Sequence, residues 1–292
     1  MENTTMTMHE LAATPPWDWP SDVDAEILAA LRNREALPAE RLLAAELAGD
    51  LIVMNDSLAK ELLRILGSQD EPEDLRGQAA IAFGAALEEA HLDGIDDRES
   101  PSVSEPLLEQ AKDALRSSYE DPGISKDVRR RALEASVRAP EPWHPGAVLA
   151  AYRDGDLAWR LTAVFCMRFV EGFDEEIVEA LESGEADILY QAVLAAGDRI
   201  VPDAWPFVRN LVLTAASGEV LLPDDPDADR DLLVAAIHAV ARIRPLEASE
   251  TLSGIIDSDD EDLSEVALEA LDMVHGAWDD EDEEDEEEPT WH

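Results

Sequence analysis

Few residues in this chain have the types and spacing that metal binding needs, and the strongest set is acidic. Four aspartates alternate along one stretch: Asp225, Asp227, Asp229 and Asp231. This alternation is typical of a calcium loop, whose carboxylates at every second position supply oxygen ligands. Such a loop needs glycine at its sixth position and glutamate at its twelfth, which here are Arg230 and Ala236. The pattern therefore favours a solvated loop with a helix N-cap over a calcium site.

The other reactive residue types do not form a catalytic set. The histidines at 91, 144, 238 and 275 are scattered without an i, i+4 pair, and one His-Glu dipeptide, His9-Glu10, precedes the body of the chain. The sequence contains no glycine-rich phosphate loop, nucleophile motif or CxxC motif. Cys166 is the single cysteine and lies in an apolar run, which predicts a buried side chain. We expect no enzymatic activity, no metal and no cofactor.

The charge of the chain indicates which partners it attracts. It has 22 Lys and Arg against 68 Asp and Glu, a net charge of −46, and without the ten adjacent acids Asp279 to Glu288 the charge is still −36. Such a field repels nucleic acid and anionic lipid and raises the association rate of cationic partners. A basic cluster occurs on one expected helix, amid acids: Lys126, Arg129, Arg130, Arg131 and Arg138. We expect these side chains to form internal ion pairs rather than a nucleic-acid site.

A repeated skeleton organises the elements that must position these residues. An Asp anchor is followed by an aliphatic residue at +1 and by Ala at +5 and +8. The copies start at Asp74, Asp127, Asp187, Asp231 and Asp262, and Asp156 starts a variant without the alanines. Recurrence about every 30 to 50 residues is typical of solenoids built from helix pairs.

The helical pattern covers most of the chain, and no stretch has the alternation of a strand. We expect first and second helices in pairs, with these ranges: 22–33 and 39 onward, 56–66 and 73–90, 105–117 and 125–138, 145–152 and 156–170, 174–181 and 186–196, 203–216 and 229–243, 246–256 and 262–274. The predicted organisation is an irregular lead-in at 1–20, a helical array at 21–277 and a disordered acidic tail at 278–292.

One face of the second helices is the candidate binding surface. Positions +3, +6, +7 and +10 lie opposite the skeleton positions +1, +5, +8 and +12. In the central repeats this face is apolar and predicts a partner-binding row: Trp159, Tyr190, Val234, Ile237 and His238. In the last repeat it predicts an acidic rim: Glu265, Glu269 and Asp272. The result would be an acid-rimmed apolar groove. Alternatively, the 217–228 loop, the lead-in or a second copy of the chain covers the row.

Two stretches, 62–84 and 255–271, resemble HEAT repeats of the phycobilisome-lyase-like type. In both, an acidic turn ends the first helix and an acid–aliphatic pair opens the second, followed by small residues. The family commonly has arginine near the start of the second helix, for which Arg76, Arg131 and Arg160 are candidates. The resemblance spans about residues 55–275 and implies an all-α, right-handed solenoid of six to seven stacked antiparallel helix pairs.

These patterns together predict a non-enzymatic scaffold or adaptor that binds a basic protein with apolar anchors. A homodimer is compatible with the same face. One alternative is an acidic inhibitor, an immunity protein or DNA mimic, that neutralises a nucleic-acid-binding protein. The alternative from the enzyme class, a phycobilin lyase-like activity, rests on the family resemblance alone. The N-terminus lacks the features of a secretory signal and no apolar run approaches the roughly 20 residues of a membrane span, so we expect a cytoplasmic protein without membrane contact.

Overall fold

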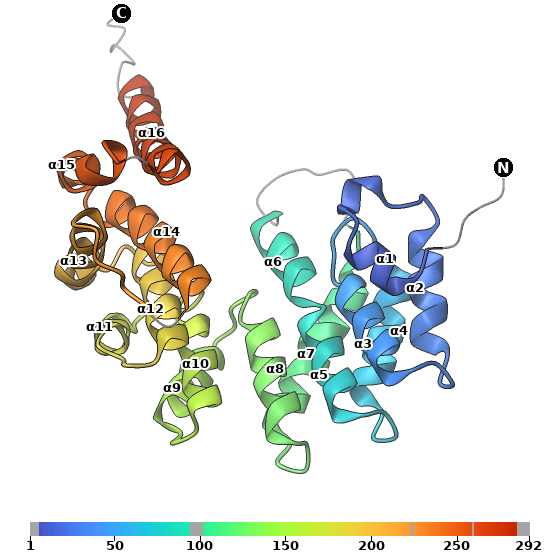
Figure 1. Ribbon diagram of the computed structural model, residues 1–292. Helices are drawn as coiled ribbons and strands as arrows, with labels where there is room; N and C mark the ends of the chain where they lie inside the picture. Colours follow the sequence, from blue (N-terminus) through green and yellow to red (C-terminus); the bar gives the residue numbers. More distant parts are fainter. Residues whose placement is uncertain (1–5, 94–101, 223–224, 259, 285–292) are drawn as a thin grey trace, which may run out of the picture. The chain divides into compact units, whose positions relative to one another are not determined.

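The computed structural model describes residues 6–93, 102–222, 225–258 and 260–284 (Figure 1). All regular elements in these ranges are helices, and no strand occurs in them, which confirms the all-α prediction. The chain forms two compact units, Met1–Ala151 (unit 1) and Tyr152–His292 (unit 2), and the division falls inside one helix. The sequence predicted a helical array over 21–277.

Unit 1 is built from helix pairs that stack side by side. Its helices are α1 (Met8–Ala12), the 3-10 turn η1 (Pro16–Asp18), α2 (Val23–Arg32), α3 (Pro38–Leu47), α4 (Asp56–Gly67), α5 (Glu73–Ile81), α6 (Gly84–Asp93), α7 (Glu105–Glu120), α8 (Lys126–Ser136) and most of α9 (His144–Arg153). The pairs are α2–α3, α4–α5 and α7–α8. The second helices α3, α5 and α8 pack in that order, and the first helices α2, α4 and α7 pack beside them.

Unit 2 repeats this architecture. Its helices are α10 (Leu157–Cys166), α11 (Asp174–Leu181), α12 (Ala186–Asp198), η2 (Pro202–Ala204), α13 (Trp205–Ala216), α14 (Pro226–Ile243), α15 (Pro245–Ile256) and α16 (Glu261–Glu284). The pairs are α11–α12, α13–α14 and α15–α16, and the second helices pack in the order α10, α12, α14, α16. Each unit is therefore a solenoid segment of antiparallel helix pairs, as the repeated skeleton predicts.

The skeleton alanines form the contact between neighbouring elements. All ten alanines at positions +5 and +8 of the full copies are at most 4% exposed, among them Ala236 and Ala267. Small side chains allow close approach, and at one contact even alanine is too large. A Cβ added to Gly197 of α12 would lie 3.1 Å from the Cα of Ala239 in α14. The alanines at positions +5 and +8 of the repeat thus mark where the backbones of neighbouring helices approach closely.

Arginines fasten the two helices of each pair in unit 1. Arg41, Arg76 and Arg129 each donate from Nε to the carbonyl ten residues earlier, at 3.1, 3.0 and 2.8 Å. These carbonyls lie at the C-terminal ends of the first helices. Carbonyl groups at the end of a helix have no hydrogen-bond partner within that helix. Arg76 was a candidate for the arginine near the start of a second helix, whereas in α8 the arginine that makes this contact is Arg129 and not the candidate Arg131.

A carboxylate near the first helix pairs forms ion pairs with Arg41 and with two further arginines. Glu71 is 6% exposed and pairs with Arg41 at 2.7 Å, Arg64 at 2.9 Å and Arg34 at 3.4 Å. The hydrogen bond from Arg41 is the main reason that the pKa of Glu71 is lowered to about 2. The carboxylate therefore stays charged and links the two helix pairs from within.

The two ends of the chain differ from prediction. The lead-in is not wholly irregular, since α1 forms within it with a capping box between Thr7 and Glu10, and Leu11 is fully buried. Trp19 fastens the segment by donating to the carbonyls of Leu11 and Thr14 at 2.9 Å. At the other end α16 continues to Glu284, because between Gly276 and that residue the sequence contains no proline or glycine that would end a helix. Residues 285–292 of the predicted tail lie outside the described ranges.

Candidate protein-interaction surface

The second helices of unit 2 position all the candidate residues. Trp159 lies on α10, Tyr190 on α12, and Val234, Ile237 and His238 on α14. The acidic residues of the predicted rim, Glu265, Glu269 and Asp272, lie on α16. Because these helices pack in the order α10, α12, α14, α16, their matching positions follow one another across one face of the unit.

The apolar row is more buried than the helical pattern suggests. Ile237 has no exposed surface and Trp159 is 6% exposed, whereas Tyr190, Val234 and His238 are half-buried. Val193 and Ile237 both occupy position +6, and both are fully buried. Position +6 thus faces a neighbouring helix rather than an open groove. The accessible part of the row is Tyr190, Val234 and His238, and we call these three residues with Glu265, Glu269 and Asp272 the acidic face.

In the part of α15 and α16 whose side chains the structure describes, the carboxylates are exposed and mostly without cationic partners. Arg230 pairs with Asp260 at 3.1 Å and Asp262 at 3.3 Å, and Arg244 pairs with Glu247 at 3.3 Å. Further exposed acids in the described part of these helices have no ion pair: Glu250, Glu261, Glu265, Glu269 and Asp272. Chemically, this surface can attract cations and hydrogen-bond donors but offers no nucleophile or general base pair.

His238 lies where the apolar and acidic parts of the face meet. Its pKa is lowered, mainly by burial and then by the charge of Arg242, while Glu269 acts in the opposite direction. The imidazole is therefore neutral at physiological pH and presents a polar but uncharged edge. The effect of Glu269 on His238 shows that the rim on α16 is electrostatically coupled to the row on α14.

Ion pairs hold the second helices of unit 2 at their C-terminal ends. Asp198 of α12 accepts from Arg168 Nε at 2.7 Å and also pairs with Arg242 of α14. Arg199 pairs with Glu171 at 3.0 Å. These contacts fix the spacing of the helices that carry the face. Helical patterns do not indicate them, because they join residues at least 28 positions apart.

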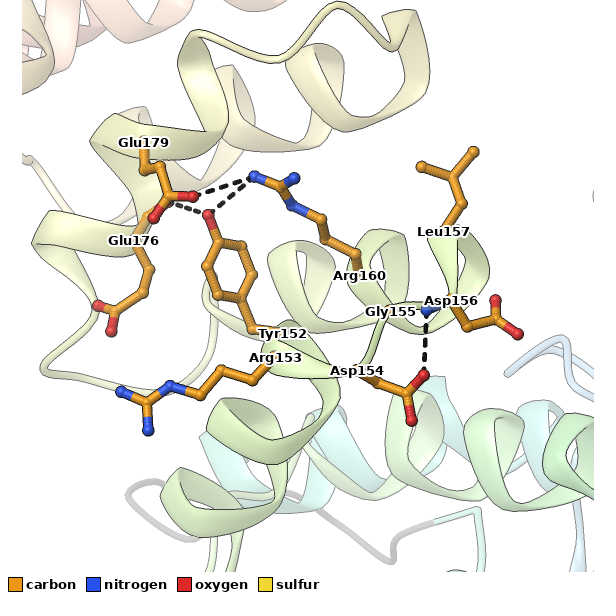
Figure 2. Close-up of a pocket in the computed structure, with 9 residues that line it drawn as sticks. All are labelled: Tyr152, Arg153, Asp154, Gly155, Asp156, Leu157, Arg160, Glu176 and Glu179. Atoms are coloured by element: carbon orange, nitrogen blue, oxygen red, sulfur yellow. Dashed lines mark hydrogen bonds and ion pairs between the residues drawn. The ribbon is translucent and has the colours of Figure 1, made fainter.

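In unit 2, a pocket of about 430 Å³ lies beside the turn at residues 154–156 (Figure 2). Tyr152 donates from its hydroxyl to the carbonyl of Glu176 at 3.3 Å and accepts from Arg160 at 3.2 Å, whose guanidinium lies 5.1 Å from the ring centroid. Arg160 also pairs with Glu179 at 3.4 Å. Burial raises the pKa of Tyr152, so the phenol stays protonated. The contacts of Tyr152 and Arg160 with Glu176 and Glu179 hold α11 against the turn at residues 154–156. Arg160 was a candidate from the sequence, whereas its partners Tyr152 and Glu179 were not.

The aspartates with calcium-loop spacing have structural roles. Asp225 caps α14 by accepting from the Ala228 N–H at 3.1 Å. One oxygen of Asp229 accepts from the N–H groups of Leu221 and Leu222, both at 2.6 Å. No group of three or more His, Cys, Asp or Glu side chains in the described ranges has the geometry of a metal site.

The basic cluster on α8 makes internal contacts, as predicted. Arg131 pairs with Glu134 at 2.9 Å, Arg130 lies between Asp127 and Glu134, and Arg138 pairs with Glu88 of α6. Cys166 is fully buried, as its apolar surroundings predict. Neither feature supplies a site for chemistry.

The fold and its surface define a helical repeat protein with an acidic second unit. No protein-family model and no curated protein match the chain. Seven chains of solved structures do match. An X-ray structure of YibA from E. coli matches with a TM-score of 0.47 and 12% identity, over 93% of this chain and 99% of that one. A crystal structure of an engineered protein matches with a TM-score of 0.34 and 16% identity, over 88% and 98%. Likenesses at this level support no transfer of function, so the fold assignment rests on the helix packing itself.

Among the described residues, no helix combines the length and apolarity that a membrane crossing requires.

Proposed function

We propose that the protein is a non-enzymatic scaffold or adaptor that binds a basic protein at the acidic face of unit 2. The observation that carries this proposal is the set of exposed carboxylates in the described part of α15 and α16 without cationic partners. Acids that serve only internal stability are expected to find arginines, as Glu71 and Asp198 do. Carboxylates left without counter-ions instead attract cations from outside the molecule.

The distribution of charge supports the second unit as the binding part. From Pro245 to His292 the sequence has 20 Asp and Glu and neither Lys nor Arg. The first 151 residues, by contrast, contain 14 Lys and Arg against 30 acids. A basic partner is therefore steered toward α15 and α16, where acids far outnumber the arginines Arg230 and Arg244 that pair with some of them.

The half-buried residues of the face supply the apolar part of recognition. Tyr190 and Val234 combine partial exposure with fixed positions on packed helices. Rigid aromatic groups beside buried surface often dominate binding energy, while exposed charges act mainly on association rate. In this proposal, Tyr190, Val234 and His238 anchor the bound partner. Glu265, Glu269 and Asp272 attract the partner electrostatically and so raise its association rate.

The proposal includes no catalytic step and no cofactor, and it places the protein in the cytoplasm. It also assigns the helix pairs to the HEAT type, on the strength of the acid–aliphatic pair and the buried alanines that follow it in α5, α8, α12, α14 and α16. HEAT-type arrays are commonly interaction scaffolds, which fits a chain in which Arg160 of the Tyr152 pocket pairs with Glu179 and with the Tyr152 hydroxyl.

One observation favours a second candidate, an acidic inhibitor that mimics DNA. Glu261, Glu265, Glu269 and Asp272 recur at intervals of three to four residues and remain exposed along one helix. A row of carboxylates can occupy a phosphate-binding surface. The two candidates differ in outcome, because a mimic blocks its partner's binding to DNA whereas a scaffold leaves it unaffected.

The test is affinity capture from native lysate with full-length protein, followed by binding measurements on the recovered partner. The parent is compared with Glu265→Lys/Glu269→Lys and with a control of equal charge change, Glu175→Lys/Glu182→Lys, at the two ends of α11. Both control residues are exposed, and neither forms an ion pair with another described residue. The proposal expects a basic partner whose association is slowed about tenfold or more by the first variant only, at low salt. Equal binding by all three proteins, or recovery of acidic partners alone, would contradict it.

A further inference from the structure

Position +6 of the second helices distinguishes α16 from its neighbours. At this position Ala80 of α5, Val193 of α12 and Ile237 of α14 are fully buried. The equivalent residue of α16 is Leu268, and it is 48% exposed. In α5, α12 and α14 a following second helix packs: α8 on α5, α14 on α12, and α16 on α14. Leu133, at position +6 of α8, is fully buried as well. Leu268 thus has the side chain of a stacking position but lacks the neighbour among the described helices.

Position +10 shows the same difference. Gly197 occupies it in α12, where the backbone of α14 approaches so closely that a Cβ would lie 3.1 Å from Ala239 Cα. Ala241 occupies it in α14 and is 2% exposed. In α16 the position holds Asp272, which is exposed. A charged carboxylate there disfavours an ordinary apolar repeat helix, because its burial without a partner charge is costly.

Together these positions define the outer edge of α16, made of Glu265, Leu268 and Asp272. Among the described helices, α16 packs on α14 and α15, and none packs against this edge. Two acids therefore flank an exposed leucine, three residues before it and four after it. On a helix these spacings place all three side chains on one face.

We propose that the outer edge of α16 binds a cationic amphipathic helix of the partner, in the place where a further second helix would stack. This deepens the proposed function and rests on it. An apolar residue of the bound helix covers Leu268, and lysines or arginines on either side pair with Glu265 and Asp272. Charge selects this occupant, since Pro245 to His292 contains no Lys or Arg. A second copy of the chain would bring the same carboxylates and be repelled.

The experiment titrates full-length protein with a synthetic peptide of about 18 residues that has leucines on one helical face and lysines beside them. A peptide with the same composition in scrambled order is the control for charge alone. Binding is followed by calorimetry and by the helix signal in circular dichroism, at about 50 and 300 mM NaCl. We expect the amphipathic peptide to become helical and to bind at least about tenfold more tightly than the scrambled one.

Variants locate the bound helix. Leu268→Ser and Glu265→Lys/Asp272→Lys should each raise Kd about tenfold or more, and Glu175→Lys/Glu182→Lys should change it less than about threefold. Unchanged far-ultraviolet spectra show that the variants fold. Equal affinity for both peptides, loss of binding by Tyr190→Ala but not by the edge variants, or dimerisation of the protein alone in sedimentation would overturn the edge as the docking place. In the first two cases the basic-partner proposal still stands, whereas no binding of either peptide at low salt contradicts both.

Discussion

Replacing His144 by asparagine should make unit 1 less sensitive to acid. His144 is fully buried, and its Nδ1 accepts from the Glu141 N–H at 2.7 Å. Its Nε2 therefore carries the proton and donates to the Ser136 hydroxyl at 3.1 Å, which donates onward to the Leu133 carbonyl at 3.2 Å. A second ring proton would point at the Glu141 N–H. Burial is the main cause that lowers the pKa of His144 from 6.5 to about 4.

The size of the effect follows from this pKa difference. A histidine whose folded pKa is lowered contributes stability above its unfolded pKa and loses it as pH falls toward the folded value. From 6.5 in the unfolded chain to about 4 in the folded protein, the loss of stability between pH 7.5 and 4.5 is about 2–3 kcal/mol. The asparagine side chain that replaces the imidazole keeps an acceptor for the Glu141 N–H but does not titrate.

The assay is urea unfolding at both pH values for the parent, His144→Asn and the control His91→Asn. His91 is exposed, so its replacement should leave the pH dependence unchanged. Carboxylate titration is common to all three proteins and cancels in the differences. The cost of His144→Asn in the free energy of unfolding at pH 7.5 should shrink by about 2–3 kcal/mol at pH 4.5. Parallel pH profiles for the parent and His144→Asn would refute the neutral, buried histidine.

Other perturbations test the packing and the charge. Gly197→Ala should cost about 1–3 kcal/mol in urea unfolding, because its Cβ meets Ala239, whereas Gly146→Ala in α9 meets nothing within 4 Å and should stabilise by about 0.5–1 kcal/mol. Glu71→Gln should flatten the acid limb of stability, since a carboxyl with a pKa lowered from 4.5 to about 2 contributes above pH 4.5 and loses that contribution as pH falls. Raising NaCl from about 10 to 300 mM should raise Tm, because screening relieves the repulsion within a chain of net charge −46, and an unchanged Tm would show the repulsion to be compensated.

Local pattern determined much of the fold. The predicted helix at 174–181 matches α11 residue for residue, because three acids open it and an apolar stripe runs its length. The repeated alanines, which the sequence places at fixed positions of successive helices, are all buried. By contrast, the predicted helix at 73–90 is interrupted between Ile81 and Gly84. Phe83 at this break is fully buried, so tertiary packing overrides a continuous helical pattern.

The site was harder to predict than the fold, for a geometric reason. A helical wheel shows which residues share a face but not where the next helix lies. From the sequence, the face with positions +6 and +10 was therefore either an open groove or a row covered by a loop, the lead-in or a second copy. In the structure, stacking of the second helices buries Ile237 and brings Gly197 against Ala239. The acids of α16 were placed correctly as exposed, since no neighbouring helix is needed to solvate a carboxylate.

The most direct test of the account is the association rate between this protein and a partner captured from native lysate. The account predicts a basic partner that associates about tenfold or more slowly with Glu265→Lys/Glu269→Lys than with the parent at about 50 mM NaCl, and a smaller difference at about 300 mM. An association rate that is unaffected both by the two reversals and by salt would contradict the acidic face as the binding surface.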